Sequence, residues 1–137
     1  MQIKRVDSTI NTNKLQESKE FYMKHFDFQL VYESDWYIEL IARDLPTNGI
    51  SFTLPQREEG EFFNGKGLII SFEVDDVDAE YKRLKDEGVI IYQEMQDKHW
   101  GERSFVVNDP NGIHLYIYSS ISPTPEYQKI YDSFKKD

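Results

Sequence analysis

Hydrophobic residues recur along the chain with two periods, one typical of helices and one typical of strands. Spacings of three and four residues predict helices over residues 13–26, 75–88 and 124–135. Stretches rich in β-branched and aromatic side chains predict strands over 30–32, 36–41, 50–54, 68–74, 89–92, 104–107 and 113–118, and a further strand is expected before the first helix. The order is therefore strand, helix and three strands, then the same again, with a helix appended.

The ends of the first two predicted helices carry local signals. Asn13 and Gln16 have the spacing of a reciprocal cap, in which each side chain bonds the other residue's backbone N–H. The second helix is expected to begin at Asp75 or Asp76 and to end at Gly88, because glycine readily adopts the left-handed conformation that closes a helix.

The third predicted helix has Thr124 as its cap and Pro125 at its first position, where the missing N–H of proline costs nothing. One face of this helix is apolar and is formed by Tyr127, Ile130, Tyr131 and Phe134. We expect this stripe to cover an apolar sheet edge or a partner subunit.

The two halves of the chain resemble one another. Trp36 corresponds to Trp100, and similar short segments recur in the same order at an offset of about 60 residues, which indicates an internal duplication. The matching segments are Asn48–Ile50 with Asn111–Ile113 and Leu30–Glu33 with Ile90–Gln93. We therefore divide the chain into module one at 1–56, a charged linker at 57–66, module two at 67–119 and the C-terminal helix at 124–135.

Composition narrows the class of protein. The 137 residues are 39% hydrophobic and 15% aromatic, which is typical of a globular domain rather than a disordered one. The net charge of −9 argues against nucleic acid and anionic membrane surfaces as partners. There is no cysteine, which excludes disulfides, thiolate nucleophiles and cysteine-held metals. Apolar runs such as Leu68–Ile70 are too short for a membrane span, so we expect a cytoplasmic protein.

Four segments together resemble the vicinal oxygen chelate superfamily, which includes glyoxalase I, bleomycin-resistance proteins and extradiol dioxygenases. They are Leu15–Tyr22, Val74–Val77, His99–Phe105 and Asp109–Gly112, and the likeness covers roughly residues 3–118. The resemblance implies an α+β fold of two βαβββ modules that form a curved mixed sheet around a cleft, usually within a homodimer.

Metal-dependent members of this superfamily hold a divalent ion with four strand residues of the cleft. The resemblance places those four positions at Asp7, Thr53, Ile69 and Tyr116. A divalent ion needs several oxygen or imidazole ligands, and a hydrocarbon such as Ile69 supplies none. The three histidines, at 25, 99 and 114, form no alternative cluster at ligand spacing. We therefore expect neither a metal nor another cofactor.

If those four positions face the cleft, the period of two along a strand places their alternate neighbours there too. The opposite faces are then almost wholly apolar, as expected of sheet faces that pack on helices. With the two tryptophans, whose indole faces stack on flat or cationic molecules, the candidate ligand-binding residues are Arg5, Asp7, Trp36, Thr53, Glu73, Trp100, His114, Tyr116 and Tyr118.

Three functions remain open. The first is metal-free binding of a small planar or cationic organic ligand, as in the antibiotic-resistance relatives. The second is a lyase, isomerase or dioxygenase-type enzyme, acting with His114 and a carboxylate or through an unrecognised metal site; His114 is the one catalytic candidate. In the third, the protein has no small-molecule function and its own C-terminal helix fills the cleft.

Overall fold

The structure is a computed structural model that describes residues 1–56 and 61–135. It divides into two compact units, each described here by itself. The first unit contains Met1–Gly67 and Asp109–Ile113, and the second contains Leu68–Asn108 and the chain from His114 onward. Part of the predicted linker, residues 57–60, lies outside the described residues. No helix in the described ranges has the length and apolar character needed to cross a membrane.

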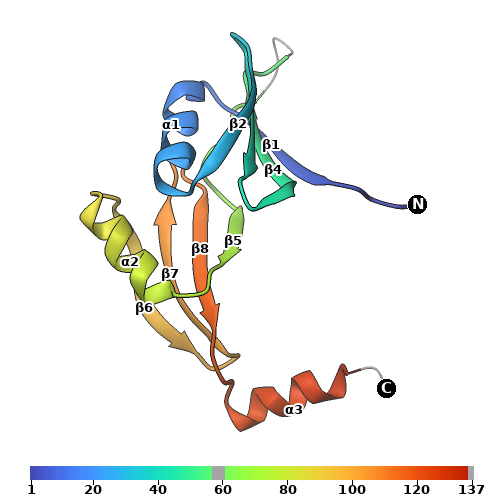
Figure 1. Cartoon of the computed structure of the whole chain (residues 1–137), viewed down its shortest axis with the longest axis vertical. Helices are drawn as coiled ribbons and strands as arrows, with labels where there is room; N and C mark the ends of the chain where they lie inside the picture. The colour runs from blue at the N-terminus through green and yellow to red at the C-terminus, as the bar shows by residue number, and fades with distance from the viewer. Residues whose placement is uncertain (57–60, 136–137) are drawn as a thin grey trace. The chain divides into compact units, whose positions relative to one another are not determined.

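The first unit is a four-stranded sheet with one helix. Its elements are β1 (Val6–Asn11), α1 (Leu15–His25), β2 (Phe28–Glu33), β3 (Tyr37–Ala42) and β4 (Leu45–Thr53). The strand order is β1-β4-β3-β2, with β1 parallel to β4 and the other neighbours antiparallel. The single helix α1 packs against β2, β3 and β4 (Figure 1).

The second unit repeats this arrangement and adds a helix. Its elements are β5 (Ile69–Glu73), α2 (Val77–Asp86), β6 (Ile91–Lys98), β7 (Glu102–Asn108), β8 (His114–Ser120) and α3 (Pro125–Ser133). The order β5-β8-β7-β6 has the same single parallel pair, β5 with β8. The predicted fold class, α+β with two βαβββ modules and a C-terminal helix, is confirmed.

Alternate residues along the strands point towards the helix and form the hydrophobic core of each unit. In the first unit the inward residues of β3 and β4, such as Leu40 and Phe52, are fully buried beneath Tyr22 of α1. In the second unit Leu84 of α2 and Phe105 of β7 are buried in the same way. Burying a side chain of this size stabilises the folded state by about 1.5–3 kcal/mol. These buried side chains lie on the face of each sheet that packs against its helix.

Two of the three predicted helix starts are confirmed. Asp76 caps α2 and accepts a hydrogen bond from the backbone N–H of Ala79 at 3.0 Å. Pro125 is at the first position of α3 behind Thr124, although the hydroxyl of Thr124 donates to the His99 carbonyl instead of capping the helix.

The predicted cap on the first helix is wrong. The residue at the cap of α1 is Lys14, so Asn13 lies one position too early to cap it. The backbone N–H of Lys14 instead donates to the Thr12 hydroxyl at 3.0 Å, and the Gln16 amide reaches Glu33 at 3.3 Å. A local contact to Thr12 and a contact of Gln16 with the distant Glu33 therefore replace the predicted reciprocal cap.

Several strand boundaries also differ from prediction, and two of them are instructive. Strand β6 begins at Ile91 rather than Val89, because Gly88 adopts a positive φ of 85° and the N–H of Val89 bonds back to the Leu84 carbonyl at 3.0 Å. These contacts close α2 and occupy the residues predicted to begin the strand. In the other case Gly49 lies inside β4, opposite Asp7, rather than in a turn that precedes the strand.

The apolar stripe of α3 does not cover a sheet edge within its unit. None of the described residues of α3 is buried, and Ile130 and Phe134 are 46% and 79% exposed. Figure 1 shows α3 extending beyond the end of β8.

A buried carboxylate ties the turn before β8 to α1 within the first unit. Asp109 is 5% exposed, and one of its oxygens accepts the backbone N–H groups of Asn111 and Ile113 at 2.8 and 2.9 Å. The other oxygen accepts the Tyr22 hydroxyl at 2.8 Å. These neutral donors compensate for burial of the charge, which is costly in the absence of partners.

We expect Tyr22→Phe to lower the free energy of unfolding by about 1–3 kcal/mol, because it leaves the buried Asp109 carboxylate without one of its donors. Urea unfolding followed by circular dichroism measures this change. The matched control is Tyr37→Phe, which loses a half-buried hydrogen bond to the Ser51 hydroxyl and is expected to cost less. Equal losses in the two variants contradict the account.

We also expect the benefit of the Tyr22 hydroxyl to decline in alkali. Burial, followed by the Asp109 charge, raises the pKa of Tyr22 well above its ordinary value, whereas the unfolded chain has a pKa of about 10. The contribution is therefore complete below about pH 10 and is lost as the pH rises through the folded pKa. The stability difference between the parent and Tyr22→Phe should be constant below about pH 10 and shrink as the pH rises above about 10, and a difference that stays constant above that pH contradicts this.

Candidate functional site

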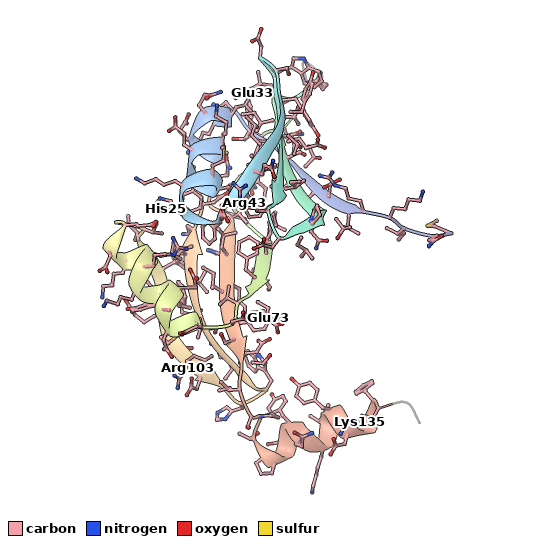
Figure 2. All side chains as sticks on the ribbon, viewed as in Figure 1. His25, Glu33, Arg43, Glu73, Arg103 and Lys135 are labelled. Atoms are coloured by element: carbon pink, nitrogen blue, oxygen red, sulfur yellow. The ribbon has the colours of Figure 1, made fainter. Side chains whose placement is uncertain are left out.

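The face of the second sheet opposite α2 is polar, and we call it the polar face. The strand register places Ile69 opposite His114, Ser71 opposite Tyr116 and Glu73 opposite Tyr118. Figure 2 shows Glu73 on the side away from α2 and Arg103 on the side of α2. This agrees with the ion pair of Arg103 with Asp78 of α2, at 3.1 Å.

Aromatic rings and carboxylates gather on this face. We call Glu73, Trp100, Glu102, Tyr116 and Tyr118 the Trp100 site. One oxygen of Glu102, Oε1, accepts both the indole N–H of Trp100 at 2.6 Å and the hydroxyl of Tyr116 at 2.9 Å. The rings of Tyr116 and Tyr118 lie 5.7 Å apart between centroids. The site therefore combines three rings with two acidic side chains.

The two phenols of the site remain neutral beside the carboxylates. Burial raises the pKa of Tyr116, and the neighbouring Glu102 adds to the rise. Burial also raises the pKa of Tyr118, with smaller contributions from the charges of Glu73 and Glu102. Among the described residues, no basic group pairs with either carboxylate within 4.0 Å. The site is therefore electronegative.

Backbone contacts fix the position of Trp100 at the turn between β6 and β7. Gly101 has a positive φ of 102°, and its carbonyl accepts the N–H of Ile121 at 2.8 Å. A side chain on Gly101 would meet the Ile121 carbonyl at 2.9 Å, so the close approach requires glycine. The hydroxyl of Tyr131 in α3 donates to the Trp100 carbonyl at 2.6 Å. The last turn of α3 thus supports the turn that carries the Trp100 side chain.

The catalytic candidate His114 lies on the same face but has an amide partner. Its Nδ1 is 2.6 Å from the side-chain oxygen of Asn108, and its ring stacks on Tyr92 with centroids 4.6 Å apart. No carboxylate among the described residues pairs with this imidazole within 4.0 Å. The expected acid–base pair of His114 with a carboxylate is therefore not formed in the described part of the chain.

The candidates of the first unit are engaged with one another or with the backbone. Arg5 and Asp7 form an ion pair at 2.8 Å above Gly49. Thr53 is buried, and its hydroxyl lies 3.2 Å from the Trp36 carbonyl. Trp36 is 47% exposed and lies beside Tyr37. Arg5 also lies 3.8 Å from the Glu39 carboxylate, so both carboxylates have a basic partner.

Sequence reasoning missed Glu102 as a site residue. It lies two residues after Trp100 and directly opposite Ser120 in the ladder between β7 and β8. Extending the period of two from Tyr118 to Ser120, and then across to β7, would have placed Glu102 on the polar face. The predicted strand begins only at Ser104, so Glu102 lies outside the residues to which the strand period is applied.

The donor atoms at the predicted metal positions do not suit a divalent ion. The carboxylate of Asp7 is paired with Arg5, Ile69 has no donor atom, and the hydroxyl of Tyr116 donates to Glu102. No group of three or more His, Asp or Glu side chains among the described residues could hold a metal ion. The divalent ion used by metal-dependent relatives therefore does not fit these residues.

Comparison with known proteins agrees with the fold. The family model of the Glyoxalase/Bleomycin resistance protein/Dioxygenase superfamily matches residues 2–117. An uncharacterized protein of Mycobacterium bovis is 32% identical over 105 residues, which are 69% of this chain and 69% of that protein.

Solved structures are similar in fold at lower sequence identity. A glyoxalase/bleomycin resistance protein/dioxygenase from Nocardioides has a TM-score of 0.74 at 20% identity, over 91% of this chain and 87% of that one. TnmS3, an antibiotic binding protein from a Streptomyces species, has a TM-score of 0.68 at 18% identity, over 88% and 96%. At these identities the structures show a shared fold. From the extent of the family match, the chain belongs to the Glyoxalase/Bleomycin resistance protein/Dioxygenase superfamily.

Proposed function

We propose that this protein binds a small organic molecule that carries a flat ring and a positive charge, without the help of a metal, and that the Trp100 site holds it. The observation that carries the proposal is the contact of Trp100 and Tyr116 with one carboxylate that has no basic partner among the described residues. Rings offer stacking surface, and a cation over a ring gains about 0.5–2 kcal/mol.

The charge of the chain supports a cationic ligand. Its net charge of −9 attracts cations over roughly a Debye length, about 8–10 Å in physiological salt. Glu73 and Glu102 would add a local attraction at the site itself. Structural relatives support the idea of a binding protein, since TnmS3 is described as antibiotic binding.

The other predicted residues would have secondary roles in this proposal. His114, on the same face, would orient the ligand by hydrogen bonding. Arg5, Asp7, Thr53 and Trp36 belong to the first unit, where Arg5 already partners the carboxylates of Asp7 and Glu39. The homodimer, the cytoplasmic location and a part in antibiotic resistance remain predictions from the sequence.

We expect tryptamine, which joins an indole ring to a protonated amine, to bind more tightly than tryptophol, its uncharged analogue, or indole-3-acetate, its anionic one. Isothermal titration calorimetry with the purified chain measures all three affinities. Tighter binding of tryptophol or indole-3-acetate than of tryptamine contradicts a cation site.

The two tryptophans provide a matched pair of variants. Trp100 and Trp36 are 38% and 47% exposed, but only Trp100 contacts a carboxylate of the polar face. We expect Trp100→Ala to weaken tryptamine binding about 2- to 30-fold, and Trp36→Ala to weaken it less. Trp100→Ala keeps the backbone carbonyl that accepts the Tyr131 hydroxyl but loses the ring contact with Tyr127 of α3, at 6.4 Å between centroids, so circular dichroism checks that the variant folds. A larger loss in Trp36→Ala would move the site to the first unit.

Metal content tests the second part of the proposal. Protein purified without chelators is expected to contain well below one divalent ion per chain, because the available donor atoms do not suit one. Inductively coupled plasma mass spectrometry measures the content. Tryptamine affinity should also be unchanged by dialysis against a chelator; a stoichiometric ion, or binding lost with the ion, refutes metal-free binding.

A further inference from the structure

The carboxylate of Glu102 is held in a fixed orientation by its neighbours. Its Oε1 accepts two hydrogen bonds, from the indole N–H of Trp100 at 2.6 Å and from the hydroxyl of Tyr116 at 2.9 Å. Glu102 is also half-buried, at the beginning of β7. Two donors on one oxygen fix the plane of the carboxylate and therefore the direction of its second oxygen, Oε2.

That second oxygen is available to a ligand. Within residues 1–56 and 61–135, no side chain donates a hydrogen bond to Oε2 of Glu102, and no basic group lies within 4.0 Å of the carboxylate. Lys98 is opposite Glu102 in the strand ladder, yet its ammonium group donates to Gln96 at 2.6 Å and lies 5.6 Å from the centroid of the Trp100 ring. Oε2 of Glu102 can therefore accept a further hydrogen bond, in a direction that the two neutral donors on Oε1 determine.

A ring surface and a carboxylate oxygen recognise different features of a cation. A ring attracts positive charge whether or not the nitrogen carries hydrogen, so a quaternary ammonium group suffices. A carboxylate oxygen forms its strong, directional bond only with an N–H group. A site with both should therefore discriminate between cations of the same charge.

We propose that Glu102 is the specificity residue of the Trp100 site, and that the ligand's cation is an ammonium, amidinium or guanidinium group that donates an N–H to Oε2 while the adjoining flat ring stacks on Trp100. This inference rests on the proposed function and restricts it to one class of cation. Permanently methylated cations of the same shape bind more weakly, because they leave Oε2 without a donor.

The test compares two probes that share a ring and a charge. Tryptamine has N–H groups on its cation, whereas N,N,N-trimethyltryptammonium has none. A charge-assisted hydrogen bond corresponds to about a 10- to 100-fold difference in affinity. We therefore expect the parent protein to prefer tryptamine by at least about tenfold in calorimetric titrations.

Three variants assign this preference to its residue. Glu102→Gln keeps the shape and one acceptor but removes the charge, and should reduce the preference to near unity. Glu73→Gln removes the same charge from the same face and should weaken both probes together, leaving their ratio unchanged. Lys98→Met removes the ammonium group above the Trp100 ring and should strengthen tryptamine binding.

The outcomes separate failure of this inference from failure of the proposed function. If neither probe binds the parent protein, the proposed function falls and the inference with it. If both bind equally, the function stands and the inference is wrong, as it also is if Glu102→Gln retains the preference. Circular dichroism checks that each variant folds. Should Glu102→Gln not fold, Tyr116→Phe decides, because it removes one of the two donors that fix the carboxylate: a reduced preference for tryptamine over the trimethyl probe supports the inference, and an unchanged preference overturns it.

Discussion

In the described part of the chain, one helix packs against each sheet, and this constraint determines which face of the sheet must be apolar. Because successive strand residues point to opposite faces, one set of side chains must be apolar to pack on the helix while the other set is released from that demand. Phe105 and Leu115 meet the first requirement in the second unit, where both are fully buried. The polar face opposite them is the part of the sheet on which chemistry can vary without loss of the core.

The two units use this freedom differently. In the first, Arg5 lies 2.8 Å from Asp7 and 3.8 Å from Glu39, so both carboxylates have a basic partner. In the second, Glu102 has neutral donors on one oxygen and no basic partner among the described residues. The same βαβββ arrangement thus carries carboxylates with a basic partner in one copy. In the other copy it carries carboxylates beside aromatic rings, with no basic partner among the described residues.

Much of the fold could be predicted because its signals are local or periodic. Asp76 caps α2 and Pro125 begins α3, since a cap depends on the next few residues. The alternation that separates Tyr116 and Tyr118 from Ile117 needs only the period of a strand, and Ile117 is indeed buried. The family motifs located the modules and the Trp100 turn.

What could not be predicted depends on contacts between residues far apart in the sequence. Gln16 bonds to Glu33 of β2 instead of completing a local cap. The significance of Glu102 depends on two donors, one from the preceding turn and one from β8, that meet at a single oxygen. Likewise, the exposure of the α3 stripe follows from where the chain leaves β8 and not from its own periodicity.

The central claim is that a cationic ring binds against Trp100 and Glu102, and the two indole N–H signals of the chain report on it directly. Nitrogen-labelled protein is titrated with tryptamine and followed by heteronuclear NMR, with Trp100→Phe used to assign the signals. The account predicts that the Trp100 indole signal and the backbone amides of β7 and β8 shift together in a saturable way while the Trp36 indole signal stays in place. Saturable shifts at Trp36 or along α1, with Trp100 unmoved, would contradict it.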